Sequence, residues 1–167
     1  MKGRLLTSLL AMVVLSGLQA QETPVVPRLV VGITIDQLRM DYVEAFSALY
    51  GERGFKRLLK EGRTYQHLEY DFVDVDKSSS VASIYSGTTP YNHGIVGDMW
   101  LDRNTLRMVN CVDDANFMGV YTSESTSPVR LKVSNLVDEL MVATQGMAET
   151  YSIAPTREMA VLSAGHA

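Results

Sequence analysis

The stretch Leu29-Val-Val-Gly-Ile-Thr-Ile-Asp36 is a nearly continuous apolar run that ends in a carboxylate. Runs of this length suit a β-strand that is buried on both faces of a parallel sheet. In open α/β sheets the chemistry lies beyond the carboxyl ends of the strands, so this position points Asp36 into the crevice of the sheet. Carboxylates there are common metal ligands, and the competing interpretation is that Asp36 caps the helix that follows.

Helix and strand patterns alternate after this run. Apolar residues at helical spacing predict helices at 40–49, 55–61, 80–86 and 131–144, the last one started by the Ser127-Pro128 pair. Strand patterns occur at 28–35, 64–71, 150–154 and 158–162. The alternation predicts an α/β fold, a three-layer sandwich with a mostly parallel sheet. Since no helix pattern follows the last predicted strand, we expect the sheet to be incomplete at its C-terminal side and the chain to be a fragment.

The amino terminus differs in kind from the rest of the chain. Lys2 and Arg4 precede an apolar run from Leu5 to Leu18, and a small residue, Ala20, stands at a plausible cleavage point. The run is shorter than the roughly 20 residues that span a bilayer, so it predicts a signal peptide at 1–20 rather than an anchor. We therefore expect a linker at 21–27, one domain at 28–167, a periplasmic or extracellular location, and no integral membrane span after cleavage.

The composition is that of one acidic globular domain. The 167 residues are 46% hydrophobic, which is enough for a core. The formal charge is −4, and loss of the two cations Lys2 and Arg4 with the signal peptide leaves −6. Such a chain is a poor nucleic-acid binder. The single cysteine, Cys111, forms no internal disulfide, and we expect it to be a buried thiol.

The serine run Ser78-Ser79-Ser80 has a setting that suits nucleophilic chemistry. It lies between a strand-like run that ends near Val75 and a predicted helix, where hydroxyls and free backbone amides stabilise an anion. Lys77 adds a point charge for a phosphate. Serine is also a common helix cap, and no Gly-x-Ser-x-Gly elbow is present.

Histidine is scarce in this chain. His67, His93 and His166 are the only three, and no two of them have the short spacing of a zinc site. His93 lies in the turn-like stretch Pro90-Tyr-Asn-His-Gly94, where an imidazole more often satisfies backbone groups than binds a metal. A closed zinc site built from this chain alone is not expected.

Several motifs in a fixed order resemble the alkaline phosphatase superfamily, in particular the exported bacterial phosphomonoesterases related to type I phosphodiesterases and nucleotide pyrophosphatases. They are Leu29–Arg39, Gly51–Gly62, Ser83–Pro90, His93–Gly97 and Ala164-Gly-His166. The resemblance implies the amino-terminal part of a domain that hydrolyses phosphate esters through a phospho-enzyme. It also implies two zinc ions and a phosphate ester as substrate.

The resemblance also assigns positions, and most of them are substituted. Asp36 matches the first zinc-ligand aspartate, and the other metal ligands of the family lie beyond residue 167. Counting back from Ser83-Ile-Tyr-Ser-Gly87, the nucleophilic threonine falls on Lys77 and the phosphate-binding asparagine falls on Asp98. Counting back from Ala164-Gly-His166, the phosphate-binding lysine and arginine fall on Thr156 and Glu158.

These substitutions oppose the chemistry of the family. An ammonium is a poor nucleophile at neutral pH, and carboxylates repel a phosphate dianion. We therefore expect an inactive relative, a pseudoenzyme without zinc in which Lys77 neutralises Asp36 and Asp98. Two alternatives stay open. One is an active phosphodiesterase, completed by the missing half, in which a register slip makes Ser78 or Ser79 the nucleophile. The other is a non-catalytic exported binding or envelope protein that keeps the fold.

Overall fold

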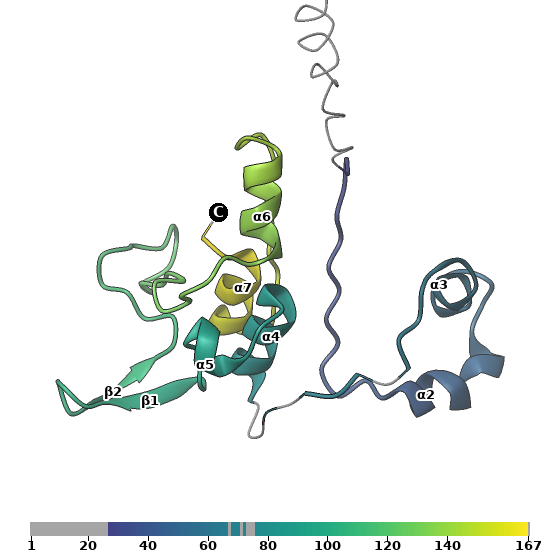
Figure 1. The fold of residues 1–167 in the computed structure, drawn as a ribbon, viewed down its shortest axis with the longest axis horizontal. Coiled ribbons are helices and arrows are strands. Elements are labelled where there is room, and N and C mark those ends of the chain that lie inside the picture. The colour runs from purple at the N-terminus through teal and green to yellow at the C-terminus, as the bar shows by residue number, and fades with distance from the viewer. Residues whose placement is uncertain (1–26, 67, 71, 73–75, 167) are drawn as a thin grey trace, which may run out of the picture. The chain divides into compact units, whose positions relative to one another are not determined.

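The structure is a computed structural model of the 167-residue chain and describes residues 27–66, 68–70, 72 and 76–166 (Figure 1). The chain divides into two compact units, Met1–Gly32 and Ile33–Ala167, and each is described by itself. The predicted signal peptide at 1–20 and nearly all of the predicted linker at 21–27 lie outside the described residues. Both therefore stay predictions.

Helices make up most of the regular structure in the described part of the second unit. In chain order the elements are α2 (Met40–Ala45), η1 (Ser47–Leu49), α3 (Phe55–Glu61), α4 (Lys77–Ser86), α5 (Pro90–His93), β1 (Met99–Asp102), β2 (Arg107–Asn110), α6 (Leu136–Ala143) and α7 (Arg157–Ala164). Within the described ranges, no helix has the length and apolar character that crossing a bilayer requires.

The strands β1 and β2 form an antiparallel hairpin that the sequence patterns did not predict. Asp102 sets its turn, because its carboxylate accepts hydrogen bonds from the backbone N–H of Asn104 (2.9 Å) and from the hydroxyl of Thr105 (3.0 Å). Short aspartate side chains stabilise turns in this way. Among the residues that the structure describes, this hairpin is the only sheet.

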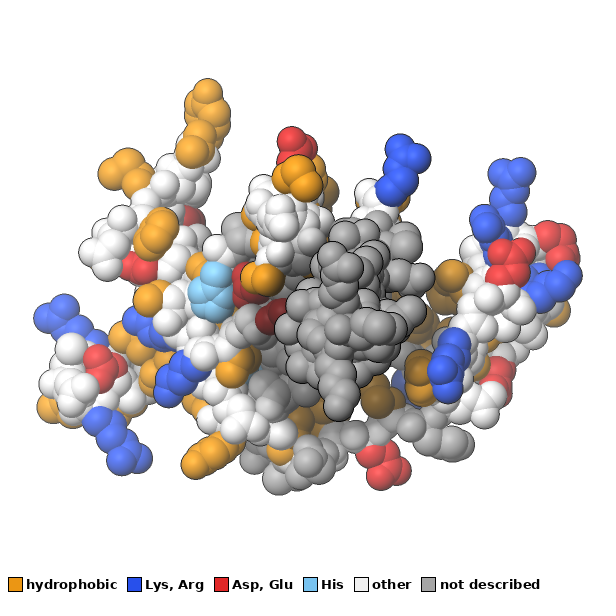
Figure 2. All heavy atoms as spheres, turned by 45° about the horizontal axis from the view of Figure 1, so that its top comes forward, with side chains coloured by type: hydrophobic (Ala, Val, Ile, Leu, Met, Phe, Trp, Pro, Cys, Tyr) orange, Lys and Arg blue, Asp and Glu red, His pale blue; other side chains and the backbone are white. Residues whose placement is uncertain are grey.

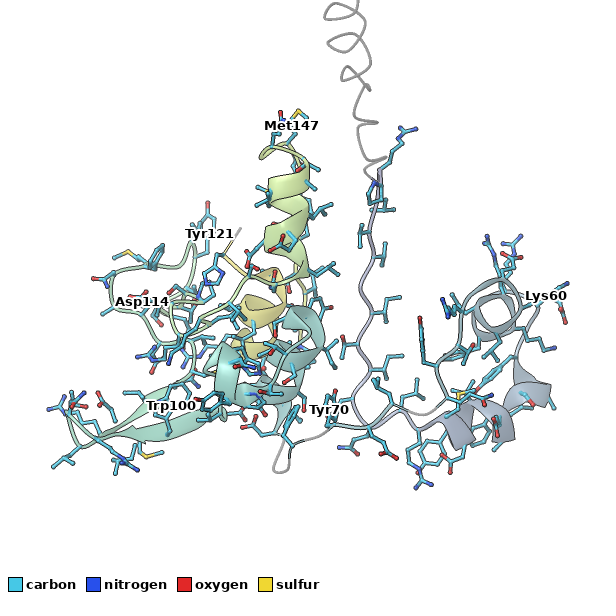
Figure 3. The ribbon with its side chains drawn as sticks, viewed as in Figure 1. Lys60, Tyr70, Trp100, Asp114, Tyr121 and Met147 are labelled. Carbon is cyan, nitrogen blue, oxygen red and sulfur yellow. The ribbon has the colours of Figure 1, made fainter. Side chains whose placement is uncertain are left out.

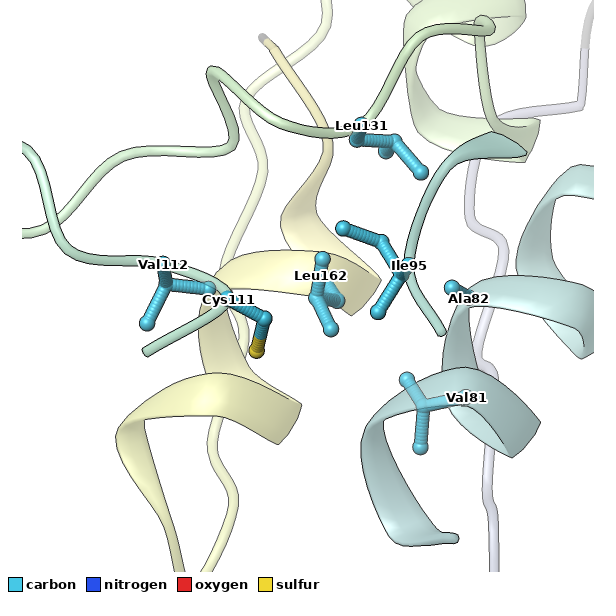
Figure 4. Packing of buried hydrophobic residues seen from close by; sticks show 7 residues of the cluster. All are labelled: Val81, Ala82, Ile95, Cys111, Val112, Leu131 and Leu162. Carbon is cyan, nitrogen blue, oxygen red and sulfur yellow. The ribbon is translucent and has the colours of Figure 1, made fainter. Parts of the chain in front are cut away.

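A small hydrophobic core holds α4 against α7 (Figures 1 and 4). Leu162 of α7 is fully buried and lies between side chains from α4 and side chains from the loops around the hairpin. Full burial of a leucine or isoleucine side chain contributes about 1.5–3 kcal/mol, so these contacts fix the position of α4. The cluster consists of Val81, Ala82, Ile95, Cys111, Val112, Leu131 and Leu162.

Three of the predicted strands are not strands in this structure. Residues 28–35 and 150–154 belong to no sheet, and the described residues of 64–71 form no strand either. The apolar side chains of the first run are exposed, for example Leu29 at 79% and Ile33 at 77%. An extended segment becomes a strand only when a second backbone supplies its hydrogen bonds. The alkaline-phosphatase-like sandwich with a mostly parallel sheet is therefore not confirmed by the elements seen here.

The fourth predicted strand, at 158–162, is wrong because these residues lie in α7. The Thr156 hydroxyl accepts a hydrogen bond from the backbone N–H of Met159 (3.4 Å) and caps the helix. A short apolar run does not by itself distinguish a strand from a helix. Here the threonine cap at position 156 favours the helix. The expectation of a sheet interrupted after residue 162 rested on this strand and loses that support.

The predicted helices are present, with shifted ends. α3 has the predicted bounds, and the pattern at 40–49 gives α2 followed by η1. α4 begins three residues earlier than predicted because Asp76 caps it. α6 begins at Leu136 because the Asn135 side chain accepts hydrogen bonds from the N–H groups of residues 137 and 138. The Ser127-Pro128 pair therefore does not start α6.

Many large apolar side chains are exposed on the described surface, between charged ones (Figure 2). Scattered apolar residues are normal on protein surfaces and need no explanation. Exposed apolar side chains are a stronger sign of an interaction surface where they belong to a segment whose backbone N–H and C=O groups also make no hydrogen bonds.

Candidate functional site

The amino end of α4 carries the position that the resemblance assigns to the nucleophile, and Asp76 sets its geometry. Asp76 Oδ1 accepts hydrogen bonds from the backbone N–H of Ser79 (2.9 Å) and from its hydroxyl (2.9 Å). The same hydroxyl accepts a hydrogen bond from the N–H of Asp76 (3.0 Å). This capping box satisfies donors that a helix start otherwise leaves free.

Asp98 lies against the same helix start. Its Oδ1 accepts hydrogen bonds from the backbone N–H of Ser78 (3.3 Å) and from the Ser78 hydroxyl. The backbone N–H of Asp98 donates to Asp76 Oδ2 (2.5 Å). We call Asp76, Ser78, Ser79 and Asp98 the α4 cap network, because their hydrogen bonds join the loop at Asp98 to the first turn of α4.

The two serines considered as nucleophiles are both inside this network. Ser78 and Ser79 have no exposed surface. Each hydroxyl already donates to a carboxylate, that of Ser78 to Asp98 and that of Ser79 to Asp76. In this conformation an ester in solution does not reach either hydroxyl.

Lys77 points to a different partner from the serines. Its Nζ lies 3.6 Å from Asp36 Oδ2, and the two side chains are 59% and 49% exposed. The structure thus brings together the residue that the resemblance assigns to the nucleophile position and the residue that it assigns to a metal ligand. Among the described residues no ion pair joins Lys77 to Asp98, whose carboxylate is bound by Ser78 instead.

Glu158 brings a further carboxylate to the neighbourhood of the α4 cap network. Its Oε1 accepts a hydrogen bond from Asn110 Nδ2 (2.7 Å). Burial acts to raise the pKa of Glu158, but hydrogen bonds from its own backbone and from Asn110, Thr156 and Arg157 outweigh it, so the pKa lies below its ordinary value. Glu158 is therefore ionised at neutral pH.

Cys111, next in the chain to Asn110, is the buried thiol that the composition led us to expect. Burial raises the pKa of its thiol to about 11, against a smaller opposite effect of the Ser78 hydroxyl. The carboxylates of Glu158, Asp98 and Asp76 raise this pKa further. These three carboxylates thus lie close enough to the Cys111 thiol to disfavour its anionic form.

The other substituted position, Thr156, serves as the cap of α7, and Arg157 follows it. Sequence reasoning missed Arg157, although it stands between the two assigned positions. Its guanidinium binds Asp113 (2.8 Å), Glu124 (2.5 Å) and Glu158 (3.3 Å). Burial acts to lower the pKa of Arg157, but these carboxylates raise it above its ordinary value. This cation is held by acids and is not presented to an anion.

Both described histidines have structural partners. His93 is fully buried; its Nδ1 accepts a hydrogen bond from the N–H of Ile95 (3.1 Å), and its Nε2 lies 2.9 Å from Ser83 Oγ. The expectation that His93 satisfies backbone groups is therefore met. His166 Nδ1 lies 2.9 Å from Asp138 Oδ2 and its Nε2 lies 3.0 Å from the Leu131 carbonyl, beside an open pocket of about 400 Å³.

The described residues do not by themselves assemble a zinc site. A zinc ion takes three or four nitrogen, oxygen or sulfur ligands. Within the described ranges no three His, Cys, Asp or Glu side chains are arranged to hold a metal ion. Asp36, the position of the family's ligand, faces an ammonium group instead.

Comparison with known proteins gives consistent similarities. A family model described as type I phosphodiesterase / nucleotide pyrophosphatase matches residues 30–158. Alkaline phosphatase PafA of Elizabethkingia meningoseptica is 35% identical over 165 residues, which are 95% of this chain and 30% of that protein. Alkaline phosphatase PhoV of Synechococcus elongatus is 37% identical over 143 residues, 84% of this chain and 26% of that protein.

The similarity extends to three dimensions. A crystal structure of PafA matches this structure with a TM-score of 0.79 at 33% identity, covering 84% of this chain and 28% of that chain. The chain thus spans less than a third of the length of the relatives it matches.

Proposed function

Because this chain belongs to the type I phosphodiesterase / nucleotide pyrophosphatase family, within the alkaline phosphatase superfamily, we propose that it is a phosphoesterase by descent that has lost catalysis. Hydrogen bonds and ion pairs within the chain take the place of the groups that would hold and attack a phosphate ester. Such a pseudoenzyme keeps the local fold of its relatives without their chemistry.

The ion pair between Lys77 and Asp36 carries this proposal. An ammonium stands where the resemblance assigns a nucleophilic hydroxyl, and a protonated amine has no free electron pair with which to attack phosphorus. Its partner is the carboxylate assigned to a metal, 3.6 Å away. The pair therefore neutralises both positions at once.

The charge around α4 supports the same conclusion. Asp98 and Glu158 stand where the family has an amide and a guanidinium, so two groups that attract phosphate are replaced by two that repel it. Two unit charges about 4 Å apart interact by about 1 kcal/mol in water and by about 4 kcal/mol near a protein surface. The repulsion of a dianion by two carboxylates is of a size that abolishes binding.

A chimera tests the site in the context of a complete domain. In it, this chain without residues 1–20 replaces the matching part of PafA, and hydrolysis of p-nitrophenyl phosphate and bis(p-nitrophenyl) phosphate is measured with zinc present. We expect rates at the no-enzyme background and less than stoichiometric zinc by elemental analysis. Hydrolysis above background, or stoichiometric zinc on the unfused chain, contradicts the proposal.

A reversal variant of the chimera supplies the matched control. It combines Lys77→Thr, Asp98→Asn, Thr156→Lys and Glu158→Arg, which restore the residue types of the family. We expect this variant to regain hydrolysis, and PafA itself sets the upper limit of the rate. A variant with only Thr156→Lys and Glu158→Arg keeps the ammonium at position 77 and is expected to stay inactive.

The hydrogen bond between the Ser78 hydroxyl and the Asp98 carboxylate favours a second candidate, an active phosphodiesterase with Ser78 as its nucleophile and Asp98 as its base. Ser78→Ala in the unreversed chimera distinguishes the two. Hydrolysis that this change abolishes establishes the second candidate, and Ser79→Ala separately tests the neighbouring hydroxyl.

Export and the complete domain belong to the same proposal. A signal peptide at 1–20 would deliver the mature chain to the periplasm or the medium, and the complete domain would be a three-layer sandwich. Mass spectrometry of the secreted protein is expected to identify Gln21 as its first residue. Retention of residues 1–20 contradicts the export.

A further inference from the structure

The ring of His166, just after α7, faces acceptor atoms at both of its nitrogens. Nδ1 lies 2.9 Å from Asp138 Oδ2 in α6, and Nε2 lies 3.0 Å from the carbonyl oxygen of Leu131. A carboxylate and a carbonyl oxygen accept hydrogen bonds and donate none. Only the doubly protonated ring, the imidazolium, therefore satisfies both contacts at once.

The backbone before His166 fixes the position of this ring. Gly165 has a φ of +74°, and a Cβ atom there would lie 2.5 Å from side-chain atoms of Asn135, so glycine is required at the turn. Asn135 Nδ2 in turn donates to the carbonyl oxygen of Leu162 (3.1 Å). This amide does not titrate, so it joins the start of α6 to α7 at any pH.

Asp138 places a negative charge beside Nδ1. Burial acts to raise the pKa of Asp138, but hydrogen bonds from the ring and backbone N–H of His166 and from the backbone N–H of Asn135 outweigh it, so the pKa lies below its ordinary value. Asp138 is therefore ionised at neutral pH. Its carboxylate favours a proton on Nδ1.

The other charged groups around the ring are farther from contact with it. Lys132 lines the open pocket beside His166 and repels a second positive charge there. Glu139 accepts a hydrogen bond from the Ser134 hydroxyl (2.6 Å) instead. The last turn of α7, residues 161–164, has no charged side chain. The Nε2 side of the ring thus faces a neutral carbonyl, and a proton is held less firmly there than on Nδ1.

We propose that His166 is a pH-sensitive latch, which holds the segment 131–134 against the end of α7 while its ring carries two protons and releases that segment when Nε2 loses its proton. The neutral ring keeps its proton on Nδ1, bound to Asp138. The lone pair of Nε2 then faces those of the Leu131 oxygen, and the contact becomes repulsive. The latch is therefore closed at lower pH and opens as the pH rises.

The segment that the latch releases leads into α6. This helix projects from α4 and α7 (Figure 1) toward Met147 (Figure 3). Leu131 belongs to the hydrophobic core cluster, and the next backbone N–H, that of Lys132, donates to the His93 carbonyl oxygen (3.0 Å). Release of the Leu131 carbonyl loosens the chain beside this hydrogen bond, so the Lys132 amide reports the state of the latch.

Nitrogen-15 NMR of the histidine rings in the full chain, from about pH 5 to pH 8, tests the protonation. We expect two protonated ring nitrogens on His166 at the acidic end and loss of the proton from Nε2 alone as the pH rises. A neutral ring protonated on Nε2 contradicts the proposal, and so does a protonation state that does not change over this range.

Hydrogen exchange of the Lys132 amide over the same range, corrected for the intrinsic effect of pH, tests the release. We expect its protection to fall about tenfold, as for loss of one hydrogen bond to a charged group. The Asp138 amide, which donates to Asn135 Oδ1 (3.0 Å), is the internal reference and should keep its protection. Unchanged protection of Lys132 overturns the release even if the ring titrates.

Two substitutions assign the effect to the ring. His166→Gln is expected to remove the pH dependence of Lys132 protection. Glu139→Gln is the matched control, because this neighbouring carboxylate binds Ser134 and not the ring, and it should leave the dependence unchanged. A dependence that survives the first change, or is lost with the second, contradicts the proposal. None of these readouts involves catalysis, so failure of the latch and failure of the proposed loss of activity are distinguishable.

Discussion

The polar groups at the start of α4 are hydrogen-bonded to one another, whereas the backbone polar groups of the described segment before α7 are not. In the α4 cap network the carboxylates, hydroxyls and amides of residues 76, 78, 79 and 98 bind one another, and both serines are fully buried. Residues 150–154 have no backbone hydrogen bond in the described structure and expose Tyr151 and Ile153. The contrast indicates that the polar groups at the start of α4 are satisfied within the chain, whereas the backbone groups of residues 150–154 are left without partners in the described structure.

The largest expected difference between the two regions comes from core side chains. Leu162→Ala removes a fully buried side chain between α4 and α7, and we expect it to lower the free energy of unfolding by about 2–5 kcal/mol. Ile153→Ala changes a side chain that is 98% exposed. We expect this change to alter the free energy of unfolding by less than about 0.5 kcal/mol. Urea denaturation followed by circular dichroism measures both, and equal losses would show that residues 150–154 are packed in the isolated chain.

Asp76→Ala probes the α4 cap network directly. The change removes the acceptor for Ser79 and for the backbone N–H of Asp98, and loss of a helix cap costs about 0.5–2 kcal/mol. Asp76→Asn is the control, since asparagine also caps helices but offers an amide group in place of one carboxylate oxygen. A smaller loss for asparagine than for alanine in urea denaturation is expected, and identical losses would contradict the capping role.

Acid should weaken the packing of α7. The folded-state pKa of Glu158 is lowered, so its contribution to stability is present above the pKa of about 4.3 that the unfolded chain has and is lost as the pH falls through the folded value. We expect the free energy of unfolding to fall as the pH drops below about 4.3, and Glu158→Gln to make that fall shallower. An unchanged slope in the variant would show that Glu158 gains nothing from its hydrogen bonds.

Lys77→Ala should have only a small effect on stability. Its ion pair with Asp36 is about half exposed, and such pairs contribute about 0–1 kcal/mol. Asp98→Ala, which leaves the buried Ser78 hydroxyl without its acceptor, should cost about 1–3 kcal/mol. Thermal denaturation of the two variants side by side makes the comparison, and a larger loss for Lys77→Ala would mean that the ion pair, not the hydrogen bonds, closes the site.

The bounds of a helix were predictable where residues next to its ends determine them. Glycines on both sides of α3 give its bounds, and the acidic and amide caps at Asp76 and Asn135 are readable afterwards as the starts of α4 and α6. The strand predicted at 158–162 failed because apolar content was weighed above the threonine cap at 156. The hairpin was missed although Asp102 begins a recognisable turn between β1 and β2.

The candidate site was predictable in its membership but not in its contacts. The sequence identifies Lys77, Asp98 and Glu158 as departures from a family pattern. It does not show that Ser78 contacts Asp98, 20 residues away, or that Asn110 contacts Glu158, 48 residues away. Such contacts depend on the packing of α4, α7 and the hairpin, and they decide which carboxylate binds which donor.

The hydrogen bonds of His93 make this imidazole a natural spectroscopic reporter. Because Nδ1 accepts from the Ile95 N–H, the proton of the neutral ring must sit on Nε2, from which it donates to Ser83. Burial also lowers the pKa of His93, so one tautomer persists to mildly acidic pH. Its ring nitrogens should therefore give a single pair of ¹⁵N resonances that report whether α4 and α5 are docked, without any added label at the surface.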